Sequence, residues 1–203
     1  MSANARCQKA DDFPIPEYNN EIYFYKKDSA KLIRLEKGLS KLDTKMKMGG
    51  MGGSESSYSI DDERSPVRFS IGTPLVFVYY TSKSNSLPSS PQMDSVIKAN
   101  GMNRSEMSAM MDKMNDPGNT TSLYSADPGN NKRKIITQAS QGMKILGKAK
   151  NSSKKYSLSI KKIKEGYYEI VVDKPLSKGE YSFVMTDMGS SDMSYKLFAF
   201  AID

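Results

Sequence analysis

The chain contains no histidine, no tryptophan and only one cysteine among its 203 residues. Without histidine there is no Ser-His-Asp or Cys-His catalytic site, no histidine general base and no zinc site of the usual cysteine and histidine ligands. Cys7 has no partner for an intrachain disulfide. No apolar run approaches the ~18 residues of a membrane-spanning helix, and glycine-rich phosphate loops and the H-E-x-x-H motif are missing. We therefore assign no catalytic, cofactor-binding or metal-binding residue from the sequence.

Apolar residues are also scarce, at 37 % of the chain, compared with roughly 45–50 % in an average soluble domain. Charged residues make up 26 %, which is close to average, so the composition does not indicate wholesale disorder. A length of 203 residues is sufficient for one large domain with its own core. The net charge of +7 is concentrated in residues 132–165, which hold eleven Lys and Arg and one Glu; the other residues hold 19 basic and 22 acidic side chains.

The cationic segment Lys132–Lys164 allows two interpretations. Lysines are common on exposed strands and sheet edges, where they prevent edge-to-edge pairing, and we favour this interpretation. The alternative is an anionic partner such as nucleic acid or an acidic polymer, which a local positive field attracts. A protein that binds single strands needs several stacking aromatic residues, whereas only Tyr156 interleaves with these lysines. We therefore do not expect nucleic acid to be the partner.

The first residues contain Ala3-Asn4-Ala5, which has the small-x-small form of a signal-peptidase cleavage site. No apolar segment precedes it, so two interpretations of residues 1–20 stay open: a tail that retains the end of an export signal, or an ordinary N-terminal tail. A lipid-anchored Cys7 is not expected, because Arg6 occupies the position at which a small residue is required.

Alternating and continuous apolar runs predict β-strands along most of the chain. Residues 75–80 are apolar without interruption, which predicts a central strand buried on both faces, and residues 41–48 alternate between an apolar and a lysine-rich face. Further short runs of this kind occupy residues 22–25, 31–35, 58–60, 67–71, 134–137, 156–160, 167–172, 181–185 and 195–202. We therefore predict about ten strands and an all-β fold of the sandwich type.

One helix is predicted between Asn103 and Asn115. Asn103 can cap it together with Glu106 at the third helical position, and an Asp-Pro-Gly-Asn motif ends it. With the preceding stretch rich in Ser, Asn and Pro, the helix forms an insertion of residues 81–118 between two strands. The Asp-Pro-Gly-Asn motif recurs at residues 127–130, and both copies predict tight turns.

The segment Leu176-Ser177-Lys178-Gly179-Glu180-Tyr181 lies between two predicted strands. Its L-x-x-G-x-Y pattern resembles the tyrosine corner of Greek-key sandwiches, in which the tyrosine hydroxyl bonds to the backbone a few residues upstream. We expect Leu176 to fill the core, Gly179 to permit the arch between two sheets, and Tyr181 to have a structural role. The predicted architecture is a Greek-key, immunoglobulin-like β-sandwich of about ten strands with one short inserted helix, formed as a single domain by residues 21–203.

Five short segments carry a broader resemblance: Phe13–Tyr18, Leu35–Lys37, Arg64–Arg68, Leu176–Phe183 and Phe198–Asp203. Taken together they resemble a group of uncharacterised exported bacterial proteins, and the resemblance extends over most of the chain except residues 81–115. It implies a β-rich protein that is exported to the periplasm or the cell surface. It implies no assigned activity and no catalytic residue.

Methionine is abundant, with 14 residues, and it is clustered. A group between Met107 and Met114 follows the helical spacing i, i+3, i+4, i+7, and smaller groups occur at residues 46–51 and 185–193. Such a helical stripe most often packs against a core, where methionine fills gaps. Two alternatives are a flexible face that binds a protein partner and a set of thioether ligands for Cu(I).

Carboxylates are the remaining candidates for chemistry. A calcium site could take oxygens from Asp61-Asp62-Glu63 or from the pair Asp187 and Asp192. Neither group has the EF-hand spacing. A carboxylate pair of the glycosidase type would come together only in the fold, and the sequence singles out no such pair.

The function that the sequence favours is a non-catalytic binding or structural module, located in the periplasm or at the cell surface. Its expected ligand is a protein or glycan that lies against exposed tyrosines, of which the chain has 12 in total, or against Lys132–Lys164. The alternatives are a carboxylate-dependent hydrolase, a copper-binding protein that uses the methionine clusters, and a binder of nucleic acid or another anionic polymer.

Overall fold

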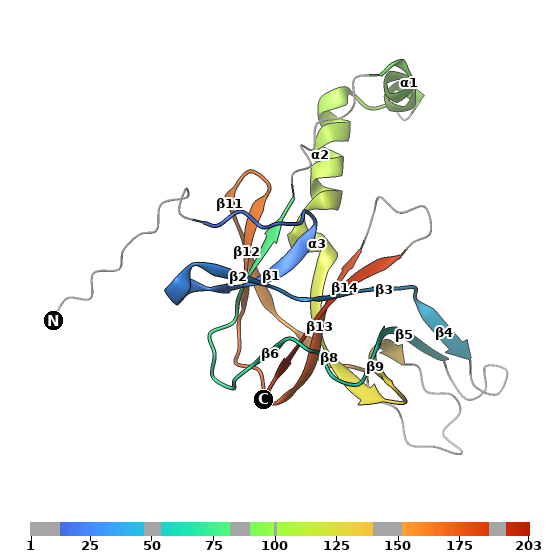
Figure 1. Ribbon diagram of the computed structural model, residues 1–203. Helices are drawn as coiled ribbons and strands as arrows, with labels where there is room; N and C mark the ends of the chain where they lie inside the picture. The colour runs from blue at the N-terminus through green and yellow to red at the C-terminus, as the bar shows by residue number, and fades with distance from the viewer. Residues whose placement is uncertain (1–12, 47–53, 82–89, 100, 140–151, 187–193) are drawn as a thin grey trace.

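Two β-sheets and three short α-helices make up the regular structure of the computed structural model (Figure 1), which describes residues 13–46, 54–81, 90–99, 101–139, 152–186 and 194–203. The sheets have five and nine strands, and every pairing is antiparallel except that of β6 with β14. The all-β sandwich predicted from the sequence is confirmed. The described strands number 14 rather than about ten, because several are short edge pieces of two to four residues.

The smaller sheet has the strand order β11-β12-β7-β1-β2. Phe77 and Val78 of its central strand β7 point to opposite faces and are both fully buried, as the uninterrupted apolar run predicted. A 3-10 turn at Lys27–Ser29 joins β1 to β2. The strands of this sheet are β11 (Leu158–Lys164), β12 (Tyr167–Val172), β7 (Val76–Tyr80), β1 (Glu21–Lys26) and β2 (Lys31–Arg34).

The larger sheet has the order β3-β14-β13-β8-β9-β5-β4, with β10 beside β8 and β6 beside β14. It is strongly curved, because β3 and β5 are far apart in this order and yet the backbone N–H of Ser59 donates to Ser40 Oγ at 3.2 Å. The strands are β3 (Glu36–Ser40), β14 (Tyr195–Ile202), β13 (Gly179–Thr186), β8 (Thr121–Gly129), β9 (Lys132–Ala139), β5 (Ser54–Asp61), β4 (Asp43–Met46), β10 (Lys155–Tyr156) and β6 (Arg68–Phe69).

The core lies between the two sheets and is rich in phenylalanine. Phe77 of the smaller sheet has its ring centroid 4.9 Å from that of Phe183 and 5.2 Å from that of Phe200, which both belong to the larger sheet. All three side chains are fully buried. Full burial of each such side chain stabilises a fold by about 1.5–3 kcal/mol, so these contacts hold the two layers together.

The tyrosine corner predicted at residues 176–181 is present. The Tyr181 hydroxyl donates to the backbone oxygen of Ser177 at 2.7 Å, and the ring stacks on Phe200. Leu176 is buried in the core between the sheets. Gly179 has φ +156, and a Cβ there would lie 3.7 Å from the Tyr181 ring, so a glycine suits this arch from β12 to β13.

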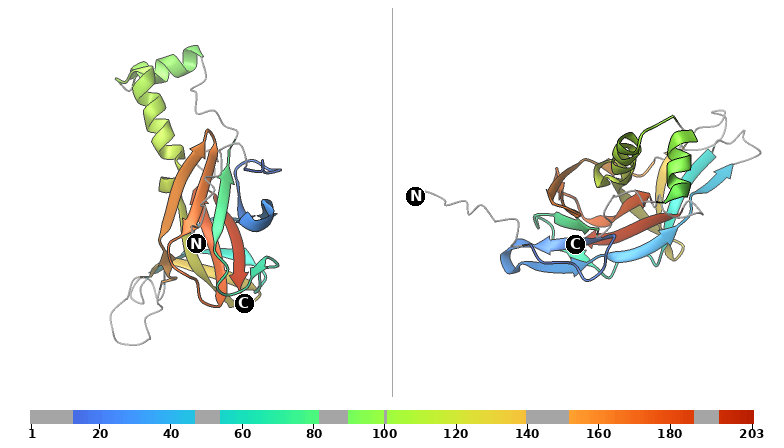
Figure 2. Two further views of the ribbon diagram at one scale, coloured as in Figure 1. Left: turned by 90° about the vertical axis from the view of Figure 1, so that its left-hand side faces the viewer. Right: turned by 90° about the horizontal axis from the view of Figure 1, so that it is seen from above.

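The helices lie between β7 and β8 in the chain, and the two longer ones project beyond the end of the sheets (Figure 2). They are α1 (Pro91–Ala99), α2 (Arg104–Asn115) and the single turn α3 (Pro117–Thr120). The predicted cap of α2 is confirmed, since Asn103 accepts the Glu106 N–H at 2.9 Å and Glu106 accepts the Asn103 N–H at 2.8 Å. The sequence analysis did not anticipate α1, which has no such capping box to mark its start.

The two Asp-Pro-Gly-Asn motifs form different structures, and neither is the isolated tight turn that was predicted. In the first, Asp116 accepts the Gly118 N–H at 2.8 Å and caps the helical turn α3. In the second, β8 continues through Gly129, and the reversal falls on Asn130 and Asn131, both with φ near +57°. Asparagine tolerates this left-handed conformation, which two-residue hairpin loops require. Strand pairing therefore overrides the local turn signal.

Candidate functional site

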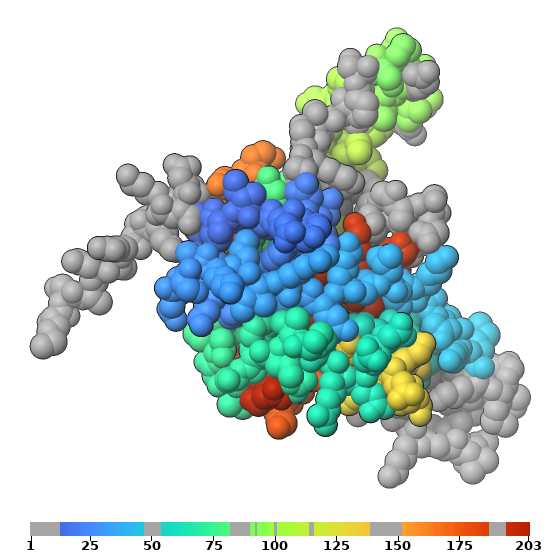
Figure 3. All heavy atoms as spheres, viewed as in Figure 1, coloured from blue at the N-terminus to red at the C-terminus, as the bar shows by residue number. Residues whose placement is uncertain are grey.

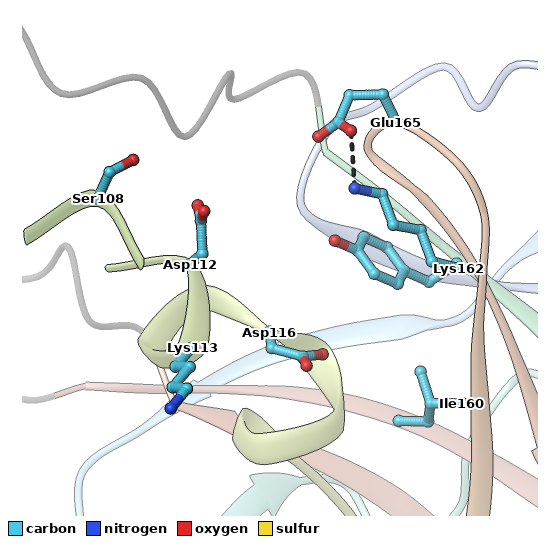
Figure 4. Close-up of a pocket in the computed structure, with 8 residues that line it drawn as sticks. Ser108, Asp112, Lys113, Asp116, Ile160, Lys162 and Glu165 are labelled. Atoms are coloured by element: carbon cyan, nitrogen blue, oxygen red, sulfur yellow. Dashed lines mark hydrogen bonds and ion pairs between the residues drawn. The ribbon is translucent and has the colours of Figure 1, made fainter. Parts of the chain in front are cut away.

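A pocket of about 580 Å³ lies between α2 and the β11–β12 hairpin (Figure 4). One wall comes from the last two turns of α2 and the start of α3, and the other comes from the hairpin and its turn. The residues that line it are Ser108, Asp112, Lys113, Asp116, Ile160, Lys162, Glu165 and Tyr168. Its size falls in the range of small-molecule and cofactor sites, which is roughly 300–1,000 Å³.

The helical wall presents polar groups because Ser108 and Asp112 are four residues apart and share one face of α2, and because Asp116 follows directly after the helix ends. The two aspartates are exposed. The amide of Asn119 donates to the Lys113 backbone oxygen at 3.0 Å and ties the end of α2 to α3. Because Gly118 occupies only Oδ1 of Asp116, the second oxygen can accept from a ligand, and Figure 4 shows this carboxylate directed toward the hairpin.

The hairpin wall is held in place by its glycine turn. Gly166 has φ +69, and a Cβ at this position would lie 2.0 Å from the backbone oxygen of Thr81, so only glycine fits. The register of β11 and β12 shifts between Lys162 and Lys164, a bulge that changes the direction of side chains beside the pocket. Lys162 Nζ and Glu165 Oε2 form an ion pair at 2.7 Å (Figure 4). This hydrogen bond raises the pKa of Lys162.

Tyr168 provides the aromatic part of the hairpin wall. Its side chain is half-buried, and its ring centroid lies 6.2 Å from that of Tyr79 in the neighbouring strand. Burial raises the pKa of the phenol, Lys162 lowers it, and the negative charges of Asp116, Glu165 and Asp112 raise it again. The hydroxyl therefore remains protonated at neutral pH and is available as a hydrogen-bond donor.

The pocket thus combines carboxylate acceptors, ammonium donors and a phenol with the apolar surfaces of Ile160 and Tyr168. Its three carboxylates and two lysines nearly balance in charge, so the pocket has no strong net field that would favour a highly charged ligand. Among the residues that the structure describes, no group of three or more acidic or cysteine side chains is arranged to hold a metal ion. The hydrogen-bonding groups and apolar surfaces of the pocket are suited to binding a polar ligand.

The calcium interpretation of Asp61-Asp62-Glu63 does not fit the structure. The backbone oxygens of Asp61 and Asp62 accept from Arg133 Nη2 and Nε at 2.9 and 3.0 Å. Glu63 accepts the Asn131 N–H, and the exposed Asp61 carboxylate lies 3.6 Å from Lys132 Nζ. The backbone oxygens of this connection therefore cap Arg133, and its side chains belong to no acidic cluster among the described residues that could hold a metal ion. Asp187 and Asp192 lie outside the described residues.

The methionine stripe of α2 does not pack against the sheets, contrary to the favoured interpretation of its spacing. Met107 and Met111 are half-buried and Met110 is 49 % exposed, and none of them belongs to a buried cluster. Met185 is buried in the core, and Met46 lies on β4, far from α2 in Figure 1. The described members of these three groups do not converge on one thioether site. Met48, Met51, Met114, Met188 and Met193 have no described side chains.

The apolar face predicted for residues 41–48 is also exposed where it is described, since Leu42 and Met46 are 44 % and 73 % exposed. Among the described strands, β4 lies at the edge of the larger sheet and pairs only with β5. Residues 47 and 48 lie outside the described part of the chain.

The cationic segment is divided among different parts of the fold. Arg133 is fully buried and Lys134 pairs with Glu55, so these charges are neutralised within the larger sheet. Lys154 and Lys155 lie over the rings of Tyr156 and Tyr124. The remaining described lysines of the segment lie mainly on the edge strand β11, where lysine protects against edge pairing: Lys161, Lys162 and Lys164.

No family model, curated protein or solved structure matches the chain. The resemblance to exported β-rich proteins therefore stays a prediction. Among the described residues, no helix has the length and apolar character needed to cross a membrane. In the sequence, Lys162 and Glu165 lie in or beside the cationic segment, whereas no motif marks Asp112, Asp116 or Tyr168. The four-residue spacing of Ser108, Asp112 and Asp116 was the available signal.

Proposed function

We propose that the protein is a non-catalytic binding module that holds a glycan in the pocket between α2 and the β11–β12 hairpin. The observation that carries this proposal is the composition of the pocket, in which Asp112 and Asp116 face the Lys162–Glu165 pair around the apolar surfaces of Ile160 and Tyr168. Sugars present hydroxyls along their edges and C–H groups on their faces. Carboxylates and amines match the hydroxyls, and a tyrosine ring matches the C–H face.

A non-catalytic role is supported by the exposure of the acidic groups. A glycosidase acid is usually set in an apolar environment that keeps it protonated at neutral pH. Here the two helix aspartates are exposed, and the side chain of Glu165 is 77 % exposed and paired with a lysine. The pocket therefore offers hydrogen bonds without an environment that favours proton transfer.

Export to the periplasm or the cell surface belongs to the same proposal, because glycan polymers are exposed in those compartments. Its support is the sequence resemblance and the Ala3-Asn4-Ala5 pattern. N-terminal sequencing of the native protein from fractionated cells tests it. We expect a periplasmic or surface fraction with a chain that starts at or near Arg6; a cytoplasmic chain that retains residues 2–5 would contradict export.

Binding to a panel of soluble polysaccharides and cell-wall fragments, measured by affinity electrophoresis and calorimetry, tests the ligand. Tyr168→Ala should weaken binding at least about tenfold, because it removes the aromatic surface. Asp112→Asn and Asp116→Asn should each weaken it about two- to tenfold, as expected for one hydrogen bond. Asp127→Asn, an exposed aspartate on β8, is the matched control and should change nothing. Failure of every polysaccharide to bind would overturn the glycan assignment.

A carboxylate-dependent hydrolase is the second candidate, because three carboxylates from two elements line one pocket. Incubation with each bound polysaccharide, followed by assay of new reducing ends, distinguishes the two functions. A binding module releases none. Release of reducing ends that Asp112→Asn or Asp116→Asn abolishes would establish the hydrolase instead.

A further inference from the structure

A second cavity, of about 420 Å³, lies between the β1–β2 hairpin and the segment 68–76. Figure 3 shows these two parts of the chain meeting on one face, the hairpin in blue and the segment in green. The pairing of β1 with β7 ends at Phe24 and Phe77, and beyond it the strands separate around the cavity. This cavity shares no residue with the pocket beside α2.

The walls of this cavity are mainly apolar. The rings of Phe24 and Phe69 lie 4.2 Å apart at their centroids, and Ile33 and Val76 complete the apolar lining. All four residues belong to or pack against buried clusters, so the fold fixes them in place. A mostly apolar cavity of this size with few polar groups is typical of a small-molecule site.

The polar groups at the cavity are predominantly cationic. Arg68 is held by Glu180 and Asp203, with its shortest ion pairs at 3.0 and 2.5 Å, and Lys27 lies 3.6 Å from Glu169. Lys26 is exposed and makes no ion pair with any residue that the structure describes. Of the cations that line the cavity, Lys26 is therefore the one whose charge a ligand can neutralise.

The acidic lining is limited to Asp28, at the tip of the hairpin. Lys31, which is opposite Lys26 in the strand register, adds a further positive charge outside the cavity. The hairpin tip thus carries more positive than negative side chains. An anionic group is favoured beside Lys26 and a second cation is disfavoured.

We propose that this cavity binds a small amphipathic carboxylate. Its aromatic or short aliphatic body lies against Phe24, Phe69 and Ile33, and its carboxylate accepts a hydrogen bond from the ammonium of Lys26. The hydroxyls of Ser70 and Thr73 line the same cavity and supply further donors. Burial of the apolar body drives binding, and the ammonium selects an anionic head group.

Titration with 2-naphthoate and with its neutral counterpart 2-naphthylmethanol tests this site, with intrinsic ligand fluorescence as the readout. We expect both compounds to bind saturably, the anion more tightly. In nitrogen-15 correlation spectra of the full chain, naphthoate should shift the amide signals of Lys26 and Thr73 and leave those of Glu165 and Tyr168 unchanged. Because that second pair lines the proposed glycan pocket, failure of one site is distinguishable from failure of the other.

Variants distinguish the contribution of the Lys26 charge to binding from the contribution of the cavity itself. Lys26→Gln should weaken naphthoate binding about two- to fivefold, the range of a partly exposed ion pair, and leave naphthylmethanol binding unchanged. Lys31→Gln removes the same charge from the same hairpin without altering the lining, and it should have a smaller effect. Thr73→Trp and Ser70→Trp place an indole at the cavity and should weaken both compounds at least tenfold in a variant that keeps the wild-type circular dichroism spectrum.

Four results would overturn the proposal. The first is the absence of saturable binding of naphthoate, and the second is equal weakening by Lys26→Gln and Lys31→Gln. The third is unchanged affinity in both tryptophan variants, since their side chains would occupy the space assigned to the ligand body. Amide shifts at Glu165 and Tyr168 alone would place the compound in the other pocket and would also overturn the assignment.

Discussion

Two regions of the molecule differ in the burial of their charged side chains. On β9, Arg133 is fully buried; it donates to Glu36 Oε2 at 2.7 Å and lies 3.6 Å from Glu180 Oε2. In the pocket beside α2, the acidic groups are exposed, and the ion pair between Lys162 and Glu165 is itself open to solvent. A buried charge must find all its partners within the fold, whereas an exposed charge remains available to a ligand. The charges of the first region are therefore used within the fold, and the exposed charges of the second region are the basis of the proposed binding site.

The Arg133 cluster joins four parts of the larger sheet. Glu36 lies on β3 and Glu180 on β13, and the two backbone oxygens belong to Asp61, which ends β5, and to Asp62, which follows it. Glu180 also accepts from Arg68 Nη1 at 3.0 Å and from the Ser65 backbone N–H at 2.9 Å, which extends the network to the strand β6. Strands distant in the sheet order are thereby tied to one side chain.

The largest effect is expected for Arg133→Met. Removing the guanidinium leaves Glu36 and Glu180 without their buried partner, and breaking such a pair costs about 3–5 kcal/mol. Urea denaturation followed by circular dichroism measures the free energy of unfolding. Lys132→Met removes an exposed charge from the neighbouring position, and it should stay within about 0.5 kcal/mol of wild type. A loss below about 1 kcal/mol for Arg133→Met would remove the contrast between the two regions.

Tyr181→Phe should have an intermediate effect, because it removes a neutral hydrogen bond from an otherwise unchanged core. We expect a loss on the order of 1–2 kcal/mol, as the Ser177 carbonyl loses its donor. Tyr124→Phe serves as the control, since its hydroxyl is not part of the corner. Equal unfolding free energies for Tyr181→Phe and wild type would show that stacking on Phe200, rather than the hydroxyl, maintains the arch.

The pH dependence of stability should report on Glu21, a buried carboxylate that is paired with two cations. Burial raises the pKa of Glu21, but hydrogen bonds from Arg34 at 2.7 Å and Lys37 at 2.9 Å more than compensate, and the pKa is lowered overall. Because the pKa is lower in the folded state, this carboxylate stabilises the protein above its unfolded pKa of about 4.3. The stabilisation is lost as the pH falls through the folded pKa.

We therefore expect Glu21→Gln to flatten the fall in stability between about pH 4.5 and pH 3, measured as urea midpoints across that range. Glu17→Gln, an exposed change in the preceding segment, is the control and should keep the wild-type slope. An unchanged slope in Glu21→Gln would mean that other carboxylates account for the acid sensitivity.

The smallest effect on stability is expected for the double variant Asp112→Asn, Asp116→Asn. Both side chains are exposed, and asparagine keeps the cap that Asp116 provides for α3. The free energy of unfolding should remain within about 0.5 kcal/mol of wild type, while glycan affinity falls. A stability loss comparable to that of Arg133→Met would instead assign these aspartates a structural role.

Local sequence signals proved most informative where one short segment contains all the partners. Asn103 and Glu106 are three residues apart and form the predicted capping box. Ser177 and Tyr181 are four residues apart and form the predicted corner. Such interactions depend on backbone geometry that a few neighbouring residues determine, so their spacing can be recognised without knowledge of the rest of the fold.

Signals that depend on distant partners were misleading. The spacing of Met107 and Met111 predicts a buried helix face, but it does not say whether a sheet lies opposite, and α2 projects beyond both sheets (Figure 2). In the sequence, the cationic run from Lys132 to Lys134 suggests a single charged patch on the surface. Strand pairing places Arg133 inside the larger sheet, with Glu36 located 97 residues away along the chain.

The sequence by itself determined the all-β class, the capped helix, the tyrosine corner and the central strand β7, because periodicity and short-range hydrogen bonding are encoded locally. Only the tertiary structure decided which charges are neutralised and which are open. The pocket beside α2 joins Asp112 and Asp116 to a hairpin about 50 residues later, and the cavity near Lys26 joins a hairpin to the segment around Thr73. Both sites arise from contacts between distant segments, and the partners of a charged side chain are fixed only when those segments meet.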